Sequence, residues 1–273
     1  MSETRTSVAR SFEALGGTAP QNYERYFVPV IGRPLAEALV DLADIQPGER
    51  VLDVACGTGI VARVAAPRIG PEGTVAGADI NPGMVTVARS LPADVPIQWH
   101  EASADSLPFP DDTFNLVLCQ LGLQFFPDRA AALREMHRVL LPSGRASVLV
   151  PGPAPEIFVV LEDALEANFT ADAAAFVQVV FSLHEPEALR ELMAEAGFRR
   201  IEVDTCAKTL RLPAPEEFLW QYVYSTPLLA AAAGLDESAR TELTHHVLPS
   251  WQPFTQDGRL VLELGYTVAS GAK

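Results

Sequence analysis

The stretch VLDVACGTG at residues 51–59 constrains the fold of this chain more than any other segment. It begins as an apolar strand, contains one acid at Asp53, and ends in Gly57 and Gly59, where the helical spacing of residues 59–68 starts. Glycine accepts the φ values that a tight turn demands and leaves no side chain between the backbone and a ligand. The stretch therefore predicts a strand, a tight turn and a helix start that bring bare backbone against a ligand, although an ordinary strand-to-helix turn also favours glycine.

Strand and helix patterns alternate from about residue 48 to residue 150. Strands are predicted at 49–55, 73–79, 96–102, 113–120 and 145–150, and helices at 59–68, 82–89 and 128–140. Asn81 is expected to cap the helix that Pro82 opens. This alternation, with two further strands predicted at 199–206 and 259–269, indicates an α/β fold: a doubly wound, mostly parallel, seven-stranded sheet of the Rossmann-like kind.

The chain is predicted to form a single domain built in three parts. Residues 1–45 would form an N-terminal helical cap, 46–150 the cofactor-binding core, and 151–273 the remainder of the sheet with helical lid insertions near 152–183 and 213–250. Additions of this kind usually cover a site. We therefore expect helices over the carboxyl ends of the strands.

Composition limits the class of partner. The formal net charge is −15, with 35 Asp and Glu against 20 Lys and Arg, whereas nucleic-acid binding normally leaves a basic footprint. Cys56, Cys119 and Cys206 are far apart and form neither a metal-ligand pattern nor a disulfide framework. No apolar signal region and no membrane-length apolar run stands out. The sequence predicts a cytoplasmic protein without membrane insertion, metal or nucleic acid, and it leaves a homodimer open.

Two ligand classes fit the glycine turn, since in open parallel sheets a ligand lies beyond the carboxyl ends of the strands. The spacing Gly57-x-Gly59-x-x-Ala62, with Asp79 about 20 residues further on, matches dinucleotide-binding turns, so a nicotinamide-dependent oxidoreductase is one alternative. Asp53 weighs against it, because a carboxylate inside the strand would gain nothing from a pyrophosphate. The same carboxylate would suit a ligand with a positively charged amino group.

Four segments, in order, resemble the motifs of class I S-adenosylmethionine-dependent methyltransferases. They are VLDVACGTG (51–59), VAGADINPGM (75–84), EASADSLPFPDDTFNLVL (101–118) and AALREMHRVLLPSGR (131–145), within a resemblance that covers about residues 20–206. The pattern is similar to the ubiquinone/menaquinone-type enzymes and to bacterial methyltransferases of secondary metabolism. It implies S-adenosyl-L-methionine as cofactor, S-adenosyl-L-homocysteine as product, and in-line methyl transfer to a small molecule, with positioning and water exclusion as the main catalytic effects. An S-adenosylmethionine-binding enzyme that does not transfer methyl is a further alternative.

The resemblance also implies roles for individual residues. Asp53 would face the methionine end of the cofactor, with Gly57 and Gly59 beneath it, and Asp79 would accept both ribose hydroxyls. The other implied cofactor-binding residues are Tyr23, Ala55, Ile80, Met84, Ser103, Ala104 and Gln120. The family usually has an acid where Ser103 stands, so the adenine contact would depend on a shorter, neutral partner or on nearby Asp105.

An apolar or aromatic acceptor is predicted from two aromatic segments, LGLQFFPD after the fourth strand and FLWQYVYSTP in the second insertion. Gln124, Phe125, Phe126, Trp220 and Tyr224 are expected to line its pocket, with core packing as the other interpretation. The catalytic residue is left unknown, because a sulfonium methyl needs little electronic help. Weak candidates for a general base are His184, His245 and His246, each of which also fits a surface histidine.

Overall fold

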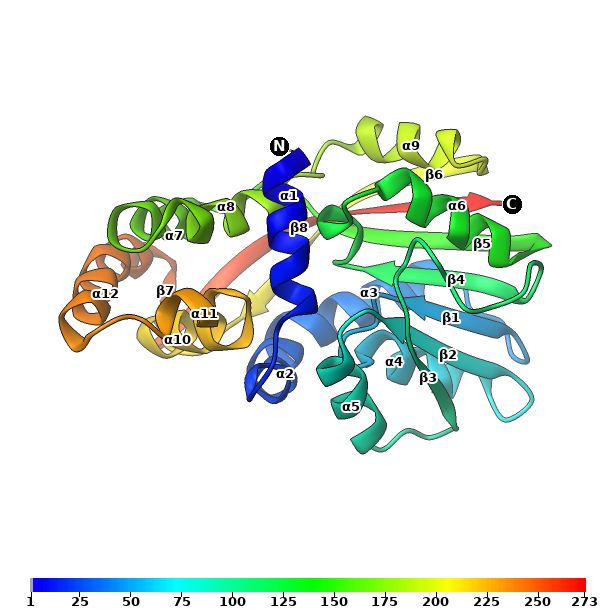
Figure 1. The fold of residues 1–273 in the computed structure, drawn as a ribbon, viewed down its shortest axis with the longest axis horizontal. Helices are drawn as coiled ribbons and strands as arrows, with labels where there is room; N and C mark the ends of the chain where they lie inside the picture. Colours follow the sequence, from blue (N-terminus) through cyan, green and yellow to red (C-terminus); the bar gives the residue numbers. More distant parts are fainter. Residues whose placement is uncertain (1) are drawn as a thin grey trace.

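A twisted sheet with the strand order β3-β2-β1-β4-β5-β8-β6 forms the frame of the molecule (Figure 1). The computed structural model describes residues 2–273. The strands are β1 (Arg50–Val54), β2 (Thr74–Asp79), β3 (Ile97–Glu101), β4 (Phe114–Gln120), β5 (Leu140–Pro151), β6 (Arg199–Arg211) and β8 (Arg259–Ala272), with the short β7 (Thr255–Gln256) paired to β8. β1 to β5 run parallel, and β8 runs antiparallel to both of its neighbours. The predicted mostly parallel, seven-stranded order is confirmed, with β7 as a small addition.

Helices cover both faces of the sheet because side chains alternate along its buried strands. Val51 packs with α3 (Arg33–Leu42) and α4 (Ile60–Ile69), whereas Leu52 packs on the opposite side with α6 (Arg129–Val139) and α9 (Pro186–Glu195). α5 (Pro82–Ser90) connects β2 to β3, and the Asn81 side chain caps it by accepting from Met84 N at 3.0 Å. The predicted cap is therefore present.

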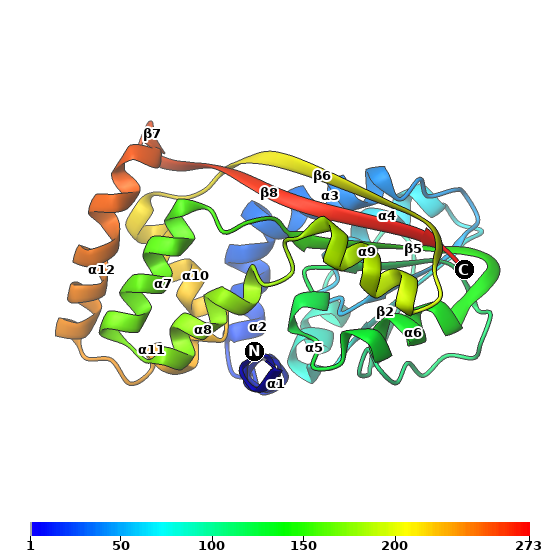
Figure 2. The ribbon, with the colours of Figure 1, turned by 90° about the horizontal axis from the view of Figure 1, so that it is seen from above.

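β6 and β8 extend well beyond the other strands as a two-stranded ribbon. Five helices gather around its far end, namely α7 (Glu156–Asn168), α8 (Ala171–Val180), α10 (Pro215–Ser225), α11 (Leu228–Ala232) and α12 (Glu237–Trp251) (Figure 2). The sequence placed these strands at 199–206 and 259–269, which is too short. The missed part of β6 alternates exposed side chains with few buried ones, so its apolar signal is weak.

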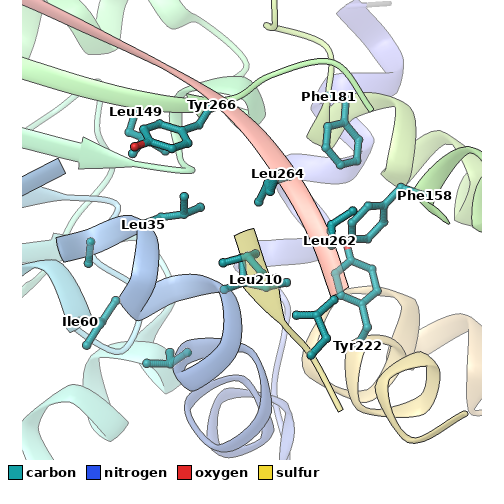
Figure 3. Close-up of a cluster of buried hydrophobic side chains, with 14 of the residues drawn as sticks. Leu35, Ile60, Leu149, Phe158, Phe181, Leu210, Tyr222, Leu262, Leu264 and Tyr266 are labelled. Carbon is teal, nitrogen blue, oxygen red and sulfur yellow. The ribbon is translucent and has the colours of Figure 1, made fainter. Parts of the chain in front are cut away.

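The helical lobe and the sheet share one hydrophobic cluster. Leu210, Leu262 and Leu264 of the ribbon lie between Leu149 of the sheet and Tyr222 of α10 (Figure 3). Beyond them, the fully buried indole of Trp251 donates to the carbonyl of Ile157 at 2.9 Å. The ribbon thus fixes the lobe to the sheet through continuous apolar packing.

The N-terminal segment contains α1 (Ser2–Glu13), α2 (Ala19–Asn22) and the π-helix η1 (Tyr23–Gly32), which leads into α3. α1 lies between the sheet and the helical lobe, in front of the carboxyl ends of the central strands (Figure 1). The sequence reading did not foresee the π-helical geometry of η1. None of the helices within residues 2–273 combines the length and apolar character of a bilayer-spanning segment.

Two smaller departures concern strand β5 and the turn before α4. β5 begins at Leu140 rather than at residue 145 as predicted, and its pairing with β4 contains an irregularity between Phe114 and Leu116. Ala55 has φ +55°, in the left-handed region where glycine is favoured.

Candidate cofactor and acceptor site

A cavity of about 420 Å³ lies at the carboxyl ends of β1, β2 and β4. The strand order reverses between β1 and β4, which is where ligands bind in open α/β sheets. α1 forms one wall through Thr6, Ala9, Arg10, Phe12 and Glu13. The volume falls within the range of about 300–1,000 Å³ that is usual for small-molecule pockets.

Asp79 at the end of β2 presents a fixed carboxylate to this cavity. Its Oδ2 accepts from Gly57 N at 2.8 Å and its Oδ1 from Asn81 N at 2.9 Å. The side chain is 9% exposed, and burial raises the pKa of its carboxyl group. Each oxygen keeps a further lone pair, so the carboxylate is held in position to accept two more hydrogen bonds side by side.

The glycine turn is stiffened by residues outside the sequence motif. The Thr58 hydroxyl donates to Glu24 Oε2 at 2.6 Å, and Arg63 forms an ion pair with Glu24 at 2.8 Å while also donating to the carbonyl of Thr58. Glu24 belongs to η1, so this network joins the π-helix to the turn that contains Gly57. The backbone of the turn is thereby fixed against the cavity.

Asn81 holds α1 over the cavity. Besides capping α5, its Nδ2 donates to the carbonyls of Phe12 at 2.6 Å, Leu15 at 2.9 Å and Glu13 at 3.3 Å. The Phe12 ring packs on Phe125 with ring centroids 4.5 Å apart. One buried side chain therefore organises both α5 and the end of α1, which covers the cavity.

Asn81→Asp separates these two roles. Aspartate keeps the oxygen that caps α5 but loses the donors to the carbonyls at the end of α1, each worth about 1 kcal/mol. We expect trypsin to cleave after Arg10 at least about tenfold faster, because α1 opens more often, and S-adenosylhomocysteine binding to weaken. Mass spectrometry of the digest measures the rate, and equal cleavage rates in both proteins would show that Asn81 does not anchor α1.

Two buried acceptors near the ends of β1 and β4 have no hydrogen-bond partner among the described residues. Asp53 Oδ2 accepts from Ala62 N at 3.1 Å, but its Oδ1 is orphaned. Gln120 Nε2 donates to the carbonyl of Gly32 at 3.0 Å, but its Oε1 is orphaned. Buried unsatisfied acceptors are rare and costly, so they indicate a ligand with N–H donors.

The predicted cofactor residues do not all reach the cavity. Those that line it are Tyr23, Ala55, Gly57, Asp79, Ile80, Met84, Ser103, Ala104 and Gln120, with Asp105 beside them. Asp53 lies behind the wall, 1% exposed. Ile80 is 41% exposed despite its apolar side chain, which suits a flat apolar ligand group such as adenine.

Gly59 is glycine for a reason other than ligand contact. It has φ +84°, and a Cβ there would lie 2.1 Å from Trp99 Cη2. The same indole also excludes a side chain at Gly77, where a Cβ would lie 2.5 Å from Trp99 Cζ3. Gly59 is not among the cavity-lining residues, so its place in the motif is explained by the ring that packs on it.

The predicted acceptor residues divide into two places. Phe125 and Phe126 line the cavity, whereas Gln124 is buried behind them at 1% exposure. Trp220 and Tyr224 line a separate open hollow on α10, so the structure does not bring them to this cavity. Their spacing signalled an apolar face, but that face packs on the lobe's own helices and Arg240.

The candidate histidines also lie outside the cavity lining. His184 Nδ1 is 2.8 Å from the carbonyl of Phe181, and its Nε2 is 3.1 Å from Glu185. His245 and His246 are exposed on α12, at the far end of the helical lobe (Figure 2). The arrangement in the structure therefore does not favour any of the three as a general base.

Sequence reasoning predicted a helical cap at 1–45 but assigned none of its first 13 residues to the site, and it missed the anchoring role of Asn81. A signal was available, since Val8, Phe12 and Leu15 follow one another at helical spacing in the N-terminal segment. All three are buried or packed against the core. The hydrogen bonds from Asn81 could not be predicted from the sequence, because they go to backbone carbonyls, which every residue has.

Comparison with known proteins places this geometry in a family. A profile described as "Methyltransferase domain" matches residues 52–148. The ubiquinone/menaquinone biosynthesis C-methyltransferase UbiE of Xanthomonas oryzae pv. oryzae is 35% identical over 218 residues, which are 72% of this chain and 81% of that protein.

Solved structures show the same fold. The YcgJ protein of Bacillus subtilis superimposes with a TM-score of 0.56 at 20% identity, over 88% of this chain and 98% of its own. Phosphoethanolamine N-methyltransferase 2 of Haemonchus contortus, solved with phosphomonomethylethanolamine and S-adenosylhomocysteine, gives 0.54 at 19% identity, over 88% of this chain and 52% of its own. Neither the oxidoreductase nor the non-transferring alternative is supported. The chain belongs to the class I S-adenosylmethionine-dependent methyltransferases, and it transfers a methyl group from this cofactor to a small molecule.

Proposed function

We propose that the cavity under α1 holds the cofactor with its ribose at Asp79 and its methionine end near Asp53 and Gln120. The observation that carries this assignment is the Asp79 carboxylate, fixed by the Gly57 and Asn81 amides at the cavity wall. A vicinal diol matches two adjacent carboxylate oxygens. Ile80, Met84, Ser103 and Ala104 would surround the adenine, and Tyr23, Ala55 and Gly57 would complete the remaining wall.

The orphaned oxygens of Asp53 and Gln120 support the position of the methionine end. An ammonium group supplies several N–H donors, and two buried acceptors without partners are what such a group would satisfy. When bound, the cofactor supplies a methyl group activated by a sulfonium. The chain's own contribution is to orient the reactants and exclude water, with Phe12 and Phe125 closing the cavity above the strand ends.

We further propose an apolar or aromatic acceptor held against Phe125 and Phe126. Both rings line the same cavity as Asp79, and they come from the segment that follows β4. The net charge of −15 favours a small molecule over nucleic acid. Three free cysteines among the described residues fit the reducing cytoplasm. A homodimer stays a prediction, and so does the division of the single domain into three parts.

The pH dependence of cofactor affinity tests the Asp53 assignment. Burial raises the pKa of Asp53 to about 8, with the charge of Asp79 acting in the same direction and the Ala62 amide and Arg63 opposing it. An ammonium beside the carboxyl group favours its ionised form, so affinity for S-adenosylhomocysteine should rise with pH up to about 8 and then level off. Asp53→Asn should flatten this rise, and calorimetry at several pH values measures it.

The raised pKa of Asp53 also makes folding stability depend on pH, in the opposite direction to cofactor affinity. Between its ordinary pKa of 3.8 and its raised pKa of about 8, folded Asp53 keeps a proton that the unfolded chain releases. Stability therefore falls as pH rises across this window, by up to about 1.4 kcal/mol per unit. Asp53→Asn should raise the melting temperature at pH values near 8. Identical pH profiles of affinity and stability in both proteins would contradict the assignment.

Activity is tested by incubating the protein with S-adenosylmethionine carrying an isotopically labelled methyl group and a panel of quinones, phenols and aromatic acids. We expect a product heavier by one labelled methyl group from at least one aromatic acceptor, and none from transfer RNA or ribosomal RNA. Labelled RNA without any labelled small molecule would overturn the proposed acceptor class.

A further inference from the structure

Two arginines face one another beside the acceptor end of the cavity without a carboxylate between them. Arg5 of α1 donates to the carbonyl of Pro127 at 3.3 Å. Arg129, the first residue of α6, donates to the carbonyl of Gln124 and to Ser182 Oγ, both at 2.9 Å. All of these acceptors are neutral, so neither positive charge is compensated by them.

Several other partly buried arginines in this acidic chain have carboxylate partners. Arg138, Arg145 and Arg63 form ion pairs at 2.6–2.8 Å. Among the side chains that the structure describes, no carboxylate lies within 4.0 Å of a nitrogen of Arg5 or Arg129. Asp128, the adjacent acid, accepts from Ala131 N at 2.8 Å as the cap of α6. Among the described arginines, Arg5 and Arg129 are the two whose Nε is both buried and without a hydrogen-bond partner.

Both guanidinium groups also keep an unused donor out of water. The Nε atoms of Arg5 and Arg129 are buried and have no hydrogen-bond partner within the described part of the chain. Burial lowers the pKa of Arg129 to about 10, and the positive charge of Arg5 lowers it further in the same direction. Both residues are only partly buried, but two like charges with unused buried donors repel one another and favour the binding of an anion.

The pair adjoins the cavity rather than the outer surface of the sheet. Pro127, whose carbonyl Arg5 binds, is a cavity-lining residue, and so is Phe125, which follows Gln124. Ser182 lies in the connection between α8 and α9, so the site is formed by α1, the start of α6 and the helical lobe. A molecule packed on Phe125 and Phe126 can therefore extend a substituent towards both arginines.

We propose that Arg5 and Arg129 bind an oxyanion carried by the methyl acceptor, so that the substrate class is an apolar or aromatic molecule with a carboxylate or phosphate group. Guanidinium groups suit this role because they present several N–H donors in a fixed plane. The inference rests on the proposed acceptor end of the cavity.

The experiment titrates the protein, saturated with S-adenosylhomocysteine, with benzoate, phenyl phosphate, inorganic phosphate and the neutral analogue benzamide. We expect benzoate or phenyl phosphate to bind at least about tenfold tighter than benzamide, as charged hydrogen bonds of this strength predict. Arg5→Met and Arg129→Met should each bring that ratio below about twofold, whereas Arg134→Met, an exposed arginine on the same helix, should preserve it.

The remaining outcomes separate the sources of failure. If inorganic phosphate binds as tightly as phenyl phosphate, the pair is a free-anion site and the acceptor assignment is overturned. Equal affinity for benzoate and benzamide in the unaltered protein also overturns it. Arg5→Met loses only the hydrogen bond to the carbonyl of Pro127, so it keeps the test valid if Arg129→Met fails to fold. Failure of the unaltered protein to bind S-adenosylhomocysteine would instead contradict the proposed cofactor site.

Discussion

Asp79→Ala is expected to weaken S-adenosylhomocysteine binding by about 30- to 150-fold, equivalent to about 2–3 kcal/mol for a lost charged acceptor. The carboxylate is held by the amides of Gly57 and Asn81, so its position does not depend on the ligand. Its loss would remove the two proposed hydrogen bonds to the ribose and leave the Gly57 amide without its acceptor. Isothermal calorimetry at one pH measures the change directly.

Asp94→Ala is the matched control, because Asp94 is an exposed acid in the loop before β3. It should bind S-adenosylhomocysteine within about twofold of the unaltered protein. Asp79→Asn should fall between the two, since the amide keeps one acceptor oxygen. Unchanged binding by Asp79→Ala would mean that the ribose lies elsewhere and that the cavity assignment is wrong.

Gly59→Ala is expected to destabilise the fold by about 3–4 kcal/mol, which combines a strained left-handed backbone with overpacking. The added Cβ would lie 2.1 Å from Trp99 Cη2, and the indole is itself confined by Gly77. The ring cannot move aside without disturbing β2. Chemical denaturation followed by circular dichroism measures the change in the free energy of unfolding.

Gly48→Ala separates the two causes. Gly48 has φ +82°, nearly the same as Gly59, but a Cβ there meets nothing within 4 Å. It should cost only the backbone strain, about 1–2 kcal/mol. Adding Trp99→Leu to Gly59→Ala should recover part of the loss, as a non-additive pair in contact does. Equal losses in Gly48→Ala and Gly59→Ala would show that Trp99 does not constrain the turn.

Much of the core could be predicted because it is encoded locally. β1, β2 and β4 are short apolar runs bounded by turn residues, and Asn81-Pro82 is a helix start that needs no tertiary information. The positions around Asp79 follow from their order along the strands. Most of the residues assigned to the cofactor by resemblance accordingly line one cavity, although their roles stay proposals.

The features that escaped prediction depend on distant partners. The end of β6, residues 207–211, is a strand because it pairs with β8 and because Leu210 joins the cluster shared with the helical lobe, whereas its own burial pattern is weak. The sequence alone suggests that Gly59 contacts a ligand, whereas the structure places Trp99 of β3 against it. Trp220 lies in an aromatic segment like the pocket's own, but the fold turns that segment towards a separate hollow. The pattern of neighbouring residues along the chain cannot show whether a segment contacts a ligand or packs against a distant part of the fold.

A crystal structure of the complex with S-adenosylhomocysteine tests the central claim most directly. The account predicts both ribose hydroxyls within hydrogen-bond distance of the Asp79 carboxylate and the amino group beside Asp53 or Gln120, with α1 closed over the ligand. A ligand found outside the cavity under α1, or one whose ribose does not meet Asp79, would contradict it.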